Sequence, residues 1–369
     1  MQASGEPFLD LTVSNPTQCG FRYDSQKILA AFQNPRALTY EPEAKGLLLA
    51  REEVARYYEE DHGVRIDPEE VLLTTSTSEA YSYVFRLLCN PHDEILVPKP
   101  SYPLFDFLGD LQDVALVPYS LEYAQGWFVD FHSLLRGLTP RTRAVLLVHP
   151  NNPTGSYVHE EEVERLNALC RERGLALIAD EVFLDYRLGK KPQKSFVANK
   201  DALTFTLSGL SKIAALPQMK VAWVITTGPD VLRQPSLDRL EIIADTYLSL
   251  NAPTQWAFPA LFAERRSLQP QVLERTRQNW NFLRSAVSKE RSCELLEAEG
   301  GWYGVIRVHK HRSGELAIEL MRKTHILVHP GHFYDFASEE FLVMSLITPS
   351  SEFKRGISGL LEYLEKAME

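Results

Sequence analysis

Short apolar segments alternate with helix-like segments between residues 70 and 225. Several of the apolar segments are continuous runs of Val, Leu and Ile, which is typical of strands buried on both faces. The predicted strands are Val71–Thr75, Glu94–Val97, Val114–Pro118, Ala144–Val148, Leu175–Ala179, Leu203–Leu207 and Val221–Thr226. Between them, Ser78–Cys89 and Glu160–Arg173 are predicted helices, and the second is amphipathic. Strands that alternate with helices predict a mostly parallel sheet covered on both faces.

The pattern changes after Gly228, where the helical segments become longer. The predicted helices are Pro229–Asp245, Gln271–Lys289 and Ser351–Ala367, with two further strands at Gly301–Val308 and Phe341–Leu346. We therefore expect a smaller α+β part packed beside the parallel sheet. Ligands of open parallel sheets bind at the carboxyl ends of strands, so the segments that follow strands are the first places to search for chemistry.

Composition narrows the function only slightly. The chain has 369 residues, a length that suits about two domains, and a formal net charge of −10, which disfavours a nucleic-acid-binding surface. The first 13 residues lack the basic region and apolar core of a secretion signal, and no apolar run approaches the roughly 20 residues that span a bilayer. The four cysteines, which form no CxxC pair, are expected to be unpaired thiols. We therefore expect a cytoplasmic protein that has no nucleic-acid or membrane partner.

Two charged residues follow predicted strands. Lys212 lies in the segment Leu207–Lys220, and a desolvated lysine amine can condense with an aldehyde cofactor. Asp180 ends the strand Leu175–Ala179, where a carboxylate can hold a proton on the ring nitrogen of a cofactor. Taken alone, Lys212 would be a surface lysine, and Asp180 an N-cap or turn residue.

Polar turns follow three other predicted strands. The string His149-Pro150-Asn151-Asn152-Pro153-Thr154-Gly155 is the most specific signal in the chain, although it also fits a rigid structural turn. Thr77 and Ser78 begin a helix, where hydroxyls and backbone N–H groups can bind phosphate or simply cap the helix. Tyr102 can stack on a cofactor ring, although a core tyrosine is as common.

In this order and spacing, the segments resemble the class I and II aminotransferases, fold type I enzymes related to aspartate aminotransferase that use pyridoxal 5′-phosphate (PLP). The similarity runs from Tyr40 to about Leu346. It implies a three-layer α/β PLP-dependent transferase fold, with a mostly parallel central sheet in the large domain and a smaller α+β domain. The implied boundaries are 1–35 for an N-terminal arm and part of the small domain, 36–275 for the large PLP-binding domain, and 276–369 for the C-terminal small domain.

The resemblance also implies roles for individual residues. Lys212 is the Schiff-base residue and proton shuttle, Asp180 the partner of the ring nitrogen, and Asn152 the amide at the ring hydroxyl. The other expected cofactor contacts are Tyr102, Thr77, Ser78, Phe183, Ser208, Lys220 and Tyr40. Tyr40 resembles a tyrosine that reaches the phosphate of the neighbouring subunit, which implies a homodimer with shared active sites.

Three positions depart from the family pattern. Lys220 replaces an arginine at the phosphate, and Phe183 replaces a tyrosine that donates to the ring hydroxyl, which should change the Schiff-base pKa. Met344 is assigned to the position of the arginine that binds the substrate carboxylate, a role that a thioether cannot fill. Arg307 is the first candidate for a replacement anchor, and a strand-end surface arginine is an equal alternative.

Three histidines lie close together in the C-terminal part of the sequence. His325, His329 and His332 surround Pro330-Gly331, but Pro330 prevents a helical HxxxH pair, and we expect no metal site. The resemblance places Pro330-Gly331-His332 near the substrate mouth, so that His332 or His329 can touch the substrate, although an ordinary loop histidine is the default interpretation. It also adds Asn15 to the expected substrate contacts.

The reaction implied by the resemblance moves an amino group from an amino acid or amine to a 2-oxo acid, with Lys212 transferring the α-proton. The same residues would also serve a PLP-dependent lyase that performs C–S or other β-elimination, or another PLP enzyme with an atypical substrate. A non-catalytic PLP-binding regulatory module is a remote alternative. A nucleotide-binding enzyme is disfavoured, because neither GxxxxGK[ST] nor GxGxxG after a strand is present.

Overall fold

An eight-stranded sheet forms the centre of the computed structural model, which describes residues 8–189, 193–309 and 312–366. Its strands, in spatial order, are β2 (Val71–Thr74), β9 (Ala222–Thr227), β8 (Thr204–Gly209), β7 (Ala176–Asp180), β6 (Thr142–Val148), β3 (Glu94–Lys99), β4 (Ala115–Tyr123) and β5 (Trp127–Val129). The five strands from β8 to β4 are parallel, whereas β9 is antiparallel to both of its neighbours and β5 is antiparallel to β4. The predicted mostly parallel sheet is confirmed.

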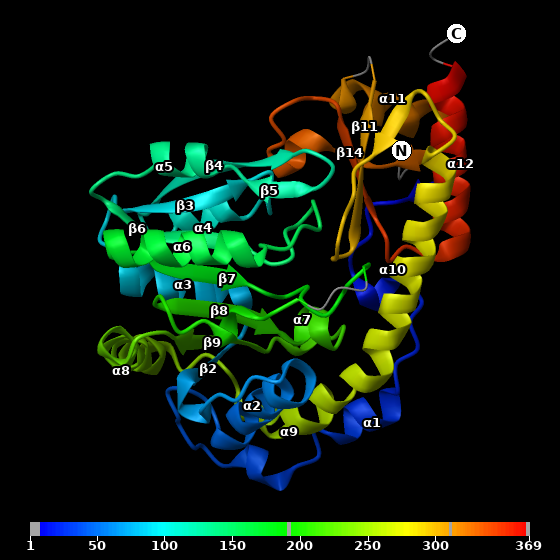
Figure 1. Cartoon of the computed structure of the whole chain (residues 1–369). Coiled ribbons are helices and arrows are strands. Elements are labelled where there is room, and N and C mark those ends of the chain that lie inside the picture. Colours follow the sequence, from blue (N-terminus) through cyan, green and yellow to red (C-terminus); the bar gives the residue numbers. More distant parts are fainter. Residues whose placement is uncertain (1–7, 190–192, 310–311, 367–369) are drawn as a thin grey trace.

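Helices cover both faces of this sheet, which confirms the three-layer α/β architecture. The helices on one face are α3 (Thr77–Leu88), α4 (Phe105–Asp110) and α8 (Asp230–Tyr247); those on the other are α5 (Phe131–Arg136) and α6 (Glu160–Arg173). Figure 1 shows α6 in front of the sheet and α3 and α4 behind it. Near β2 and β9, α2 (Leu48–His62) and α9 (Ala252–Ala263) pack on the face opposite α3.

The C-terminal part contains a second, antiparallel sheet. Its strands, in spatial order, are β10 (Cys293–Leu295), β11 (Tyr303–Val308), β14 (Phe341–Ser345) and β13 (His329–Pro330). The remaining elements are α11 (Ser313–Thr324), α12 (Ser350–Lys366), and a short parallel pair formed by β1 (Leu9–Asp10) and β12 (Ile326–Leu327). The helices around this sheet bury the side chains of alternate strand positions, as the predicted α+β part requires.

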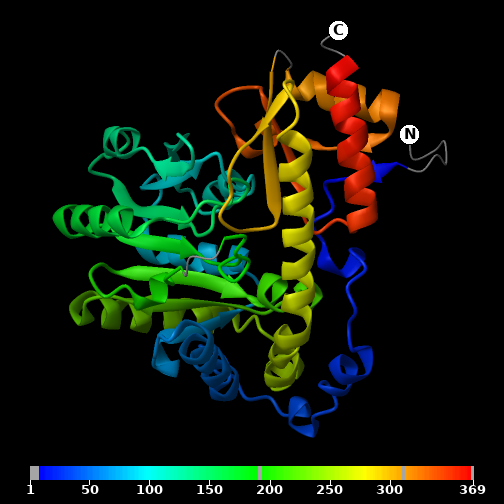
Figure 2. The ribbon, with the colours of Figure 1, turned by 45° about the vertical axis from the view of Figure 1, so that its right-hand side comes forward.

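The long helix α10 (Arg265–Val287) joins the two parts, and the N-terminal segment with α1 (Ser25–Ala30) runs along the same side (Figure 2). The predicted boundary at 275/276 falls within α10, and residues 1–7 of the predicted arm lie outside the described residues. The domain boundaries therefore stay predictions.

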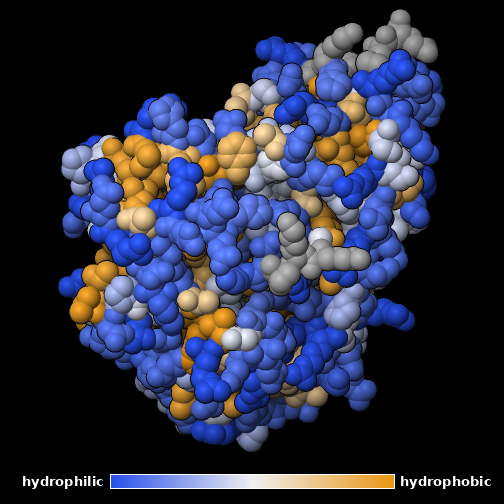
Figure 3. Space-filling view, viewed as in Figure 1, coloured by the Kyte–Doolittle hydropathy of each residue, from blue (hydrophilic) through white to orange (hydrophobic). Residues whose placement is uncertain are grey.

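The surface of the described residues is consistent with the composition. The face in Figure 3 is mostly hydrophilic, and its hydrophobic residues form separate patches. Among the described residues, no helix combines the length and apolar character needed to cross a membrane. All four cysteines are free thiols, as predicted.

Candidate active site

The predicted site residues gather where three neighbouring parallel strands end. In the registers of β6, β7 and β8, Val148 lies opposite Asp180, and Asp180 lies opposite Leu207. The backbone of His149 donates a 2.7 Å hydrogen bond to the carbonyl of Asp180. The turn after β6, the carboxylate that ends β7 and the segment after β8 therefore meet at one edge of the sheet, where parallel-sheet proteins bind ligands.

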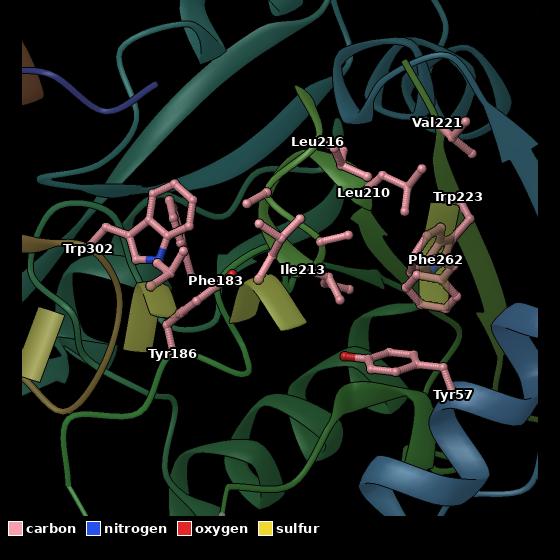
Figure 4. Close-up of a cluster of buried hydrophobic side chains, with 14 of the residues drawn as sticks. Tyr57, Phe183, Tyr186, Leu210, Ile213, Leu216, Val221, Trp223, Phe262 and Trp302 are labelled. Carbon is pink, nitrogen blue, oxygen red and sulfur yellow. The ribbon is translucent and has the colours of Figure 1, made fainter. Parts of the chain in front are cut away.

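Lys212 lies on the one-turn helix α7 (Leu210–Ile213), which follows β8 directly. The residue is partly exposed, but its Nζ atom lies 4.9 Å from the ring centroid of Trp302 and 5.4 Å from that of Phe183. Figure 4 shows the Trp302, Phe183 and Tyr186 side chains gathered beside Ile213. Desolvation by these surroundings lowers the pKa of Lys212 to about 8, although the nearby charge of Asp180 opposes the shift. About a tenth of this amine is therefore uncharged and nucleophilic at pH 7, far more than for an ordinary lysine.

Asp180 is buried at the end of β7 and is held by two donors. The Tyr81 hydroxyl donates to Oδ2 over 2.7 Å, and the Val182 backbone donates to Oδ1 over 3.0 Å. Burial raises the pKa of Asp180, whereas the two hydrogen bonds and the charge of Lys212 act in the opposite direction. Sequence reasoning missed Tyr81, because an aromatic residue on a predicted helix carries no sign of its partner.

The two asparagines of the turn after β6 have different environments. The Asn151 amide donates to the Pro100 carbonyl over 3.0 Å and to Thr154 Oγ1 over 2.9 Å, so this side chain builds the turn. Asn152 is also buried, but its Oδ1 atom has no hydrogen-bond partner in the described part of the chain. Because buried polar atoms are nearly always paired, this carboxamide fits a ligand contact.

The N-terminus of α3 provides both a cap and an anion site. Ser76 is the N-cap and accepts from the backbone of Glu79 over 3.2 Å, while the Glu79 carboxylate accepts from the backbone of Thr75 over 2.7 Å. The cap expected from the sequence is thus present, and it starts the helix at Thr77. Thr77 and Ser78 are partly exposed in the first turn, where backbone N–H groups attract anions.

Three other predicted cofactor contacts border this edge. Lys220 is exposed and has a left-handed backbone (φ 53°) just after a 3₁₀ turn, so its ammonium is available to an anion. Tyr102 is 38% exposed, and burial of the rest of the ring, together with Tyr303 and Asp180, raises its pKa to about 12. The Ser208 hydroxyl is buried and lies 3.5 Å from the Glu181 carbonyl, so it faces the protein interior.

The small sheet presents one face to Lys212, and this face corrects the assignment of Met344. Along β14, Phe341 and Val343 pack in the same cluster as Phe183 and Trp302, whereas Met344 packs among the helices on the opposite face. Side chains of a strand alternate between faces, so the position on the side of Phe183 and Trp302 is Val343. The prediction that Met344 takes the anchor position is wrong by one residue, but the residue on that side is also apolar.

The predicted substrate contacts have other partners. Asn15 is exposed, and its side chain accepts from the backbone of Thr17 over 3.1 Å. Arg307 lies four residues, or roughly 13 Å, beyond Tyr303 on β11, and pairs with Glu294 at 3.5 Å. His332 faces α11, where its Cε1 would lie 3.3 Å from a Cβ added at Gly314. The structure therefore brings none of these three predicted residues into contact with Lys212.

Tyr40 stands apart from the other site residues. Its side chain is 79% exposed and lines a cavity of about 190 Å³ formed by residues 40–44 and 248–252. Among the described residues, no group of three His, Cys, Asp or Glu side chains is arranged to hold a metal ion. The site is therefore defined by Lys212, Asp180, Asn152 and the start of α3.

Comparison with known families agrees with this geometry. The family model for class I and II aminotransferases matches residues 6–358. The chain belongs to this family. Membership makes the protein an enzyme that transfers amino groups, and it sets aside the regulatory-module and nucleotide-binding alternatives.

Individual aminotransferases match over nearly the whole chain. The glutamate-pyruvate aminotransferase AlaA of Haemophilus influenzae is 24% identical over 99% of this chain and 92% of its own length. The alanine aminotransferase of Mycobacterium bovis is 26% identical over 99% and 87%. The structure of the alanine aminotransferase of Pyrococcus furiosus aligns with a TM-score of 0.89 at 20% identity, covering 99% and 94%. This last similarity confirms the predicted fold.

Proposed function

We propose that this aminotransferase binds PLP covalently through Lys212 and moves an amino group from an amino acid or amine to a 2-oxo acid. The observation that carries the proposal is the meeting of Lys212, Asp180 and Asn152 at one sheet edge. Lys212 has an amine that is partly uncharged near neutral pH, Asp180 is a buried carboxylate, and Asn152 has a carboxamide whose buried Oδ1 atom has no partner among the described residues. These are the three groups that the aldehyde, ring nitrogen and ring hydroxyl of PLP require.

The remaining contacts follow from the geometry. The backbone N–H groups of Thr77 and Ser78, which are partly exposed, and the ammonium of Lys220, which is exposed, would hold the phosphate because each offers a donor. Tyr102 would cover one face of the ring, while Phe183 lies beside Lys212 and offers no hydroxyl to it. Ser208 would support the cofactor site only indirectly, since its hydroxyl faces the Glu181 carbonyl.

When bound, PLP supplies an electron-accepting ring that makes a substrate α-proton removable. Asp180 holds the proton at the ring nitrogen, because its carboxylate is fixed by Tyr81 and Val182 and is shielded from water. Lys212 would take up the substrate α-proton and hold it for return, and its lowered pKa suits a base that works near neutral pH.

The named relatives suggest which substrates to test first. Alanine and glutamate are the first donors, and pyruvate and 2-oxoglutarate the matching acceptors. Phe183 makes one cofactor property specific to this chain, because no phenol at that position can stabilise an ionised ring hydroxyl.

A homodimer would explain the exposure of Tyr40. Tyr40 is 79% exposed and Leu248 is 37% exposed, and both line the cavity at residues 40–44 and 248–252. An apolar region of this kind is typical of a protein–protein contact. In that dimer Tyr40 would reach the phosphate site of the neighbouring subunit. The cytoplasmic location expected from the sequence stays a prediction.

The proposal is tested by turnover of PLP-loaded protein with a panel of amino acids and amines, each with and without a 2-oxo acid. We expect formation of a new 2-oxo acid or aldehyde only when an acceptor 2-oxo acid is present, in stoichiometric exchange. Release of pyruvate and ammonia that does not depend on an added 2-oxo acid would contradict transamination and favour the lyase.

A further inference from the structure

The small-sheet face that looks toward Lys212 carries one guanidinium among the described residues, that of Arg307, which is partly exposed but already paired. Its side chains come from alternate positions of β11 and β14, where Tyr303 lies opposite Ser345, Val305 opposite Val343, and Arg307 opposite Phe341. Val305, Val343 and Phe341 cannot bind a carboxylate. The partner of Arg307 is Glu294, and its guanidinium lies 5.5 Å from the Phe341 ring at the far end of the strand.

Tyr303 is a polar side chain of this face whose ring contacts Phe183, a neighbour of the reacting amine. Its ring centroid lies 6.3 Å from that of Phe183, whose ring in turn lies 5.4 Å from Lys212 Nζ. Ser345, directly across the sheet, is completely buried, so a substrate cannot reach its hydroxyl without rearrangement. Tyr303 retains 8% exposure and hydrogen-bonds Ser14 of the N-terminal segment, which is itself partly exposed.

Resting on the proposed function, we infer that the Tyr303 hydroxyl binds the substrate carboxylate in place of an arginine, and that the substrates are amino acids and 2-oxo acids with a single carboxylate. A phenol supplies one directed hydrogen bond and no charge, so it can hold one carboxylate but does not compensate the burial of a second. The surrounding rings of Trp302, Phe183 and Tyr102 offer contact to an uncharged side chain. Alanine-like or aromatic donors therefore fit this site, and of the two donors that the names of the relatives suggest, glutamate should be the poorer substrate.

The protonation state of the phenols agrees with a donor role. Burial raises the pKa of Tyr303, and it raises that of Tyr102 to about 12. Both hydroxyls therefore remain protonated, and able to donate to a carboxylate, across the pH range in which aminotransferases are assayed.

Tyr334 provides a matched control for substitution of Tyr303. Its ring lies 6.2 Å from that of Tyr303, and it is similarly buried, but its hydroxyl lies 3.0 Å from Nδ1 of His329, whereas the partner of the Tyr303 hydroxyl is Ser14. Tyr303→Phe and Tyr334→Phe thus remove the same atom from neighbouring rings, and only the first removes the inferred contact.

The experiment compares the PLP-loaded wild type with these two variants. For each, KM and kcat are measured with alanine and with ethylamine, which lacks the carboxylate. We expect Tyr303→Phe to raise KM for alanine about tenfold or more, with a smaller change in kcat, because hydrogen bonds to charged groups are the strong ones. In Tyr303→Phe, KM for ethylamine should change less than about twofold, because ethylamine has no carboxylate to bind. In Tyr334→Phe, KM for alanine and for ethylamine should each change less than about twofold, because no bond to the substrate is lost. An unchanged KM for alanine, or an equal rise for both donors, would overturn the inference.

Equilibrium binding of propionate, measured by calorimetry on the same PLP-loaded proteins, separates this inference from the proposed function. Propionate carries one carboxylate and cannot react. Binding to the wild type that weakens about tenfold or more in Tyr303→Phe, and not in Tyr334→Phe, supports the inference even if turnover fails. Two results would overturn the role of Tyr303 and leave the proposed function unaffected. The first is transamination by a wild type that does not bind propionate, and the second is propionate binding that both variants retain.

Discussion

The Tyr81 hydroxyl donates a 2.7 Å hydrogen bond to Oδ2 of Asp180. The two residues are 99 positions apart in the sequence, and both are buried where α3 packs against the central sheet. Burial favours the neutral form of Asp180, and this hydrogen bond is one of the interactions that oppose it. Tyr81 is therefore a positioning residue for the carboxylate that the cofactor ring requires.

Replacing Tyr81 with phenylalanine should remove its hydrogen bond to Asp180 while the cofactor still binds. Loss of the bond raises the pKa of Asp180 further, so a smaller fraction of the carboxylate is ionised and kcat should fall about tenfold. The loss of kcat should be greatest at low pH, because Asp180 of the variant becomes protonated at a higher pH than Asp180 of the wild type. A pH profile of kcat for the wild type and Tyr81→Phe tests this, with Asp180→Asn as the variant that should lose far more activity at every pH. A uniform loss across pH would contradict the role of Tyr81.

Glu181, directly after Asp180, should make stability depend on pH. It is buried, accepts from Ser195 Oγ over 2.6 Å, and has a pKa raised by burial from 4.5 to about 7. Because the folded-state pKa lies above the unfolded one, the folded state binds the proton more tightly. The contribution of Glu181 to stability is therefore largest below pH 4.5 and declines as pH rises to about 7.

The variant Glu181→Gln cannot ionise at this position and so isolates the effect. His62 and Asp185, whose charges act on the pKa of Glu181, are present in both proteins. Between pH 5 and pH 8 the wild type should lose about 2 to 3 kcal/mol of unfolding free energy relative to the variant. Urea unfolding of the cofactor-free proteins at the two pH values measures it. A difference between the two proteins that stays constant with pH would show that Glu181 does not titrate in this range.

Restoring a hydroxyl at Phe183 should shift the titration of the bound cofactor. The Phe183 ring packs edge-on against Trp302 at 5.2 Å and lies 5.4 Å from Lys212 Nζ. In Phe183→Tyr the added phenol can donate to the ionised ring hydroxyl of PLP, which lowers the pKa of the neighbouring covalent linkage. The visible absorbance band should therefore titrate at lower pH than in the wild type, with Phe183→Leu as the control that adds no donor. Titration at the same or a higher pH in Phe183→Tyr would contradict the placement of Phe183 at the ring hydroxyl.

The sequence predicts the central sheet well because its strands are continuous apolar runs that end in polar turns. The predicted strands of this sheet all occur, with ends displaced by a few residues. Helix α10 was predicted to begin at Gln271 but begins at Arg265, because Pro270, a residue typical of a helix start, lies inside the helix. The antiparallel direction of β9 could not be predicted, since strand direction leaves no mark on an apolar run.

Some residues of the site could be predicted from the sequence, and others could not. Lys212, Asp180 and Asn152 follow strands directly, so the motif and the sheet edge together locate them. From the sequence, Met344 is assigned to the position of the carboxylate-binding arginine, but the alternation of β14 places Val343, not Met344, on the side of Phe183 and Trp302, because a register error of one residue exchanges the two faces. Tyr81 and Tyr303 were missed because their roles depend on partners that only the fold brings close.

The central claim is that Lys212 carries the cofactor. The most direct test incubates the protein with PLP, reduces it with borohydride to fix any covalent linkage, and maps the modified peptide by mass spectrometry. We predict that the pyridoxyl group is found on Lys212, and that Lys212→Ala carries none at any lysine. Modification of another lysine, or an unmodified wild type, would contradict the account.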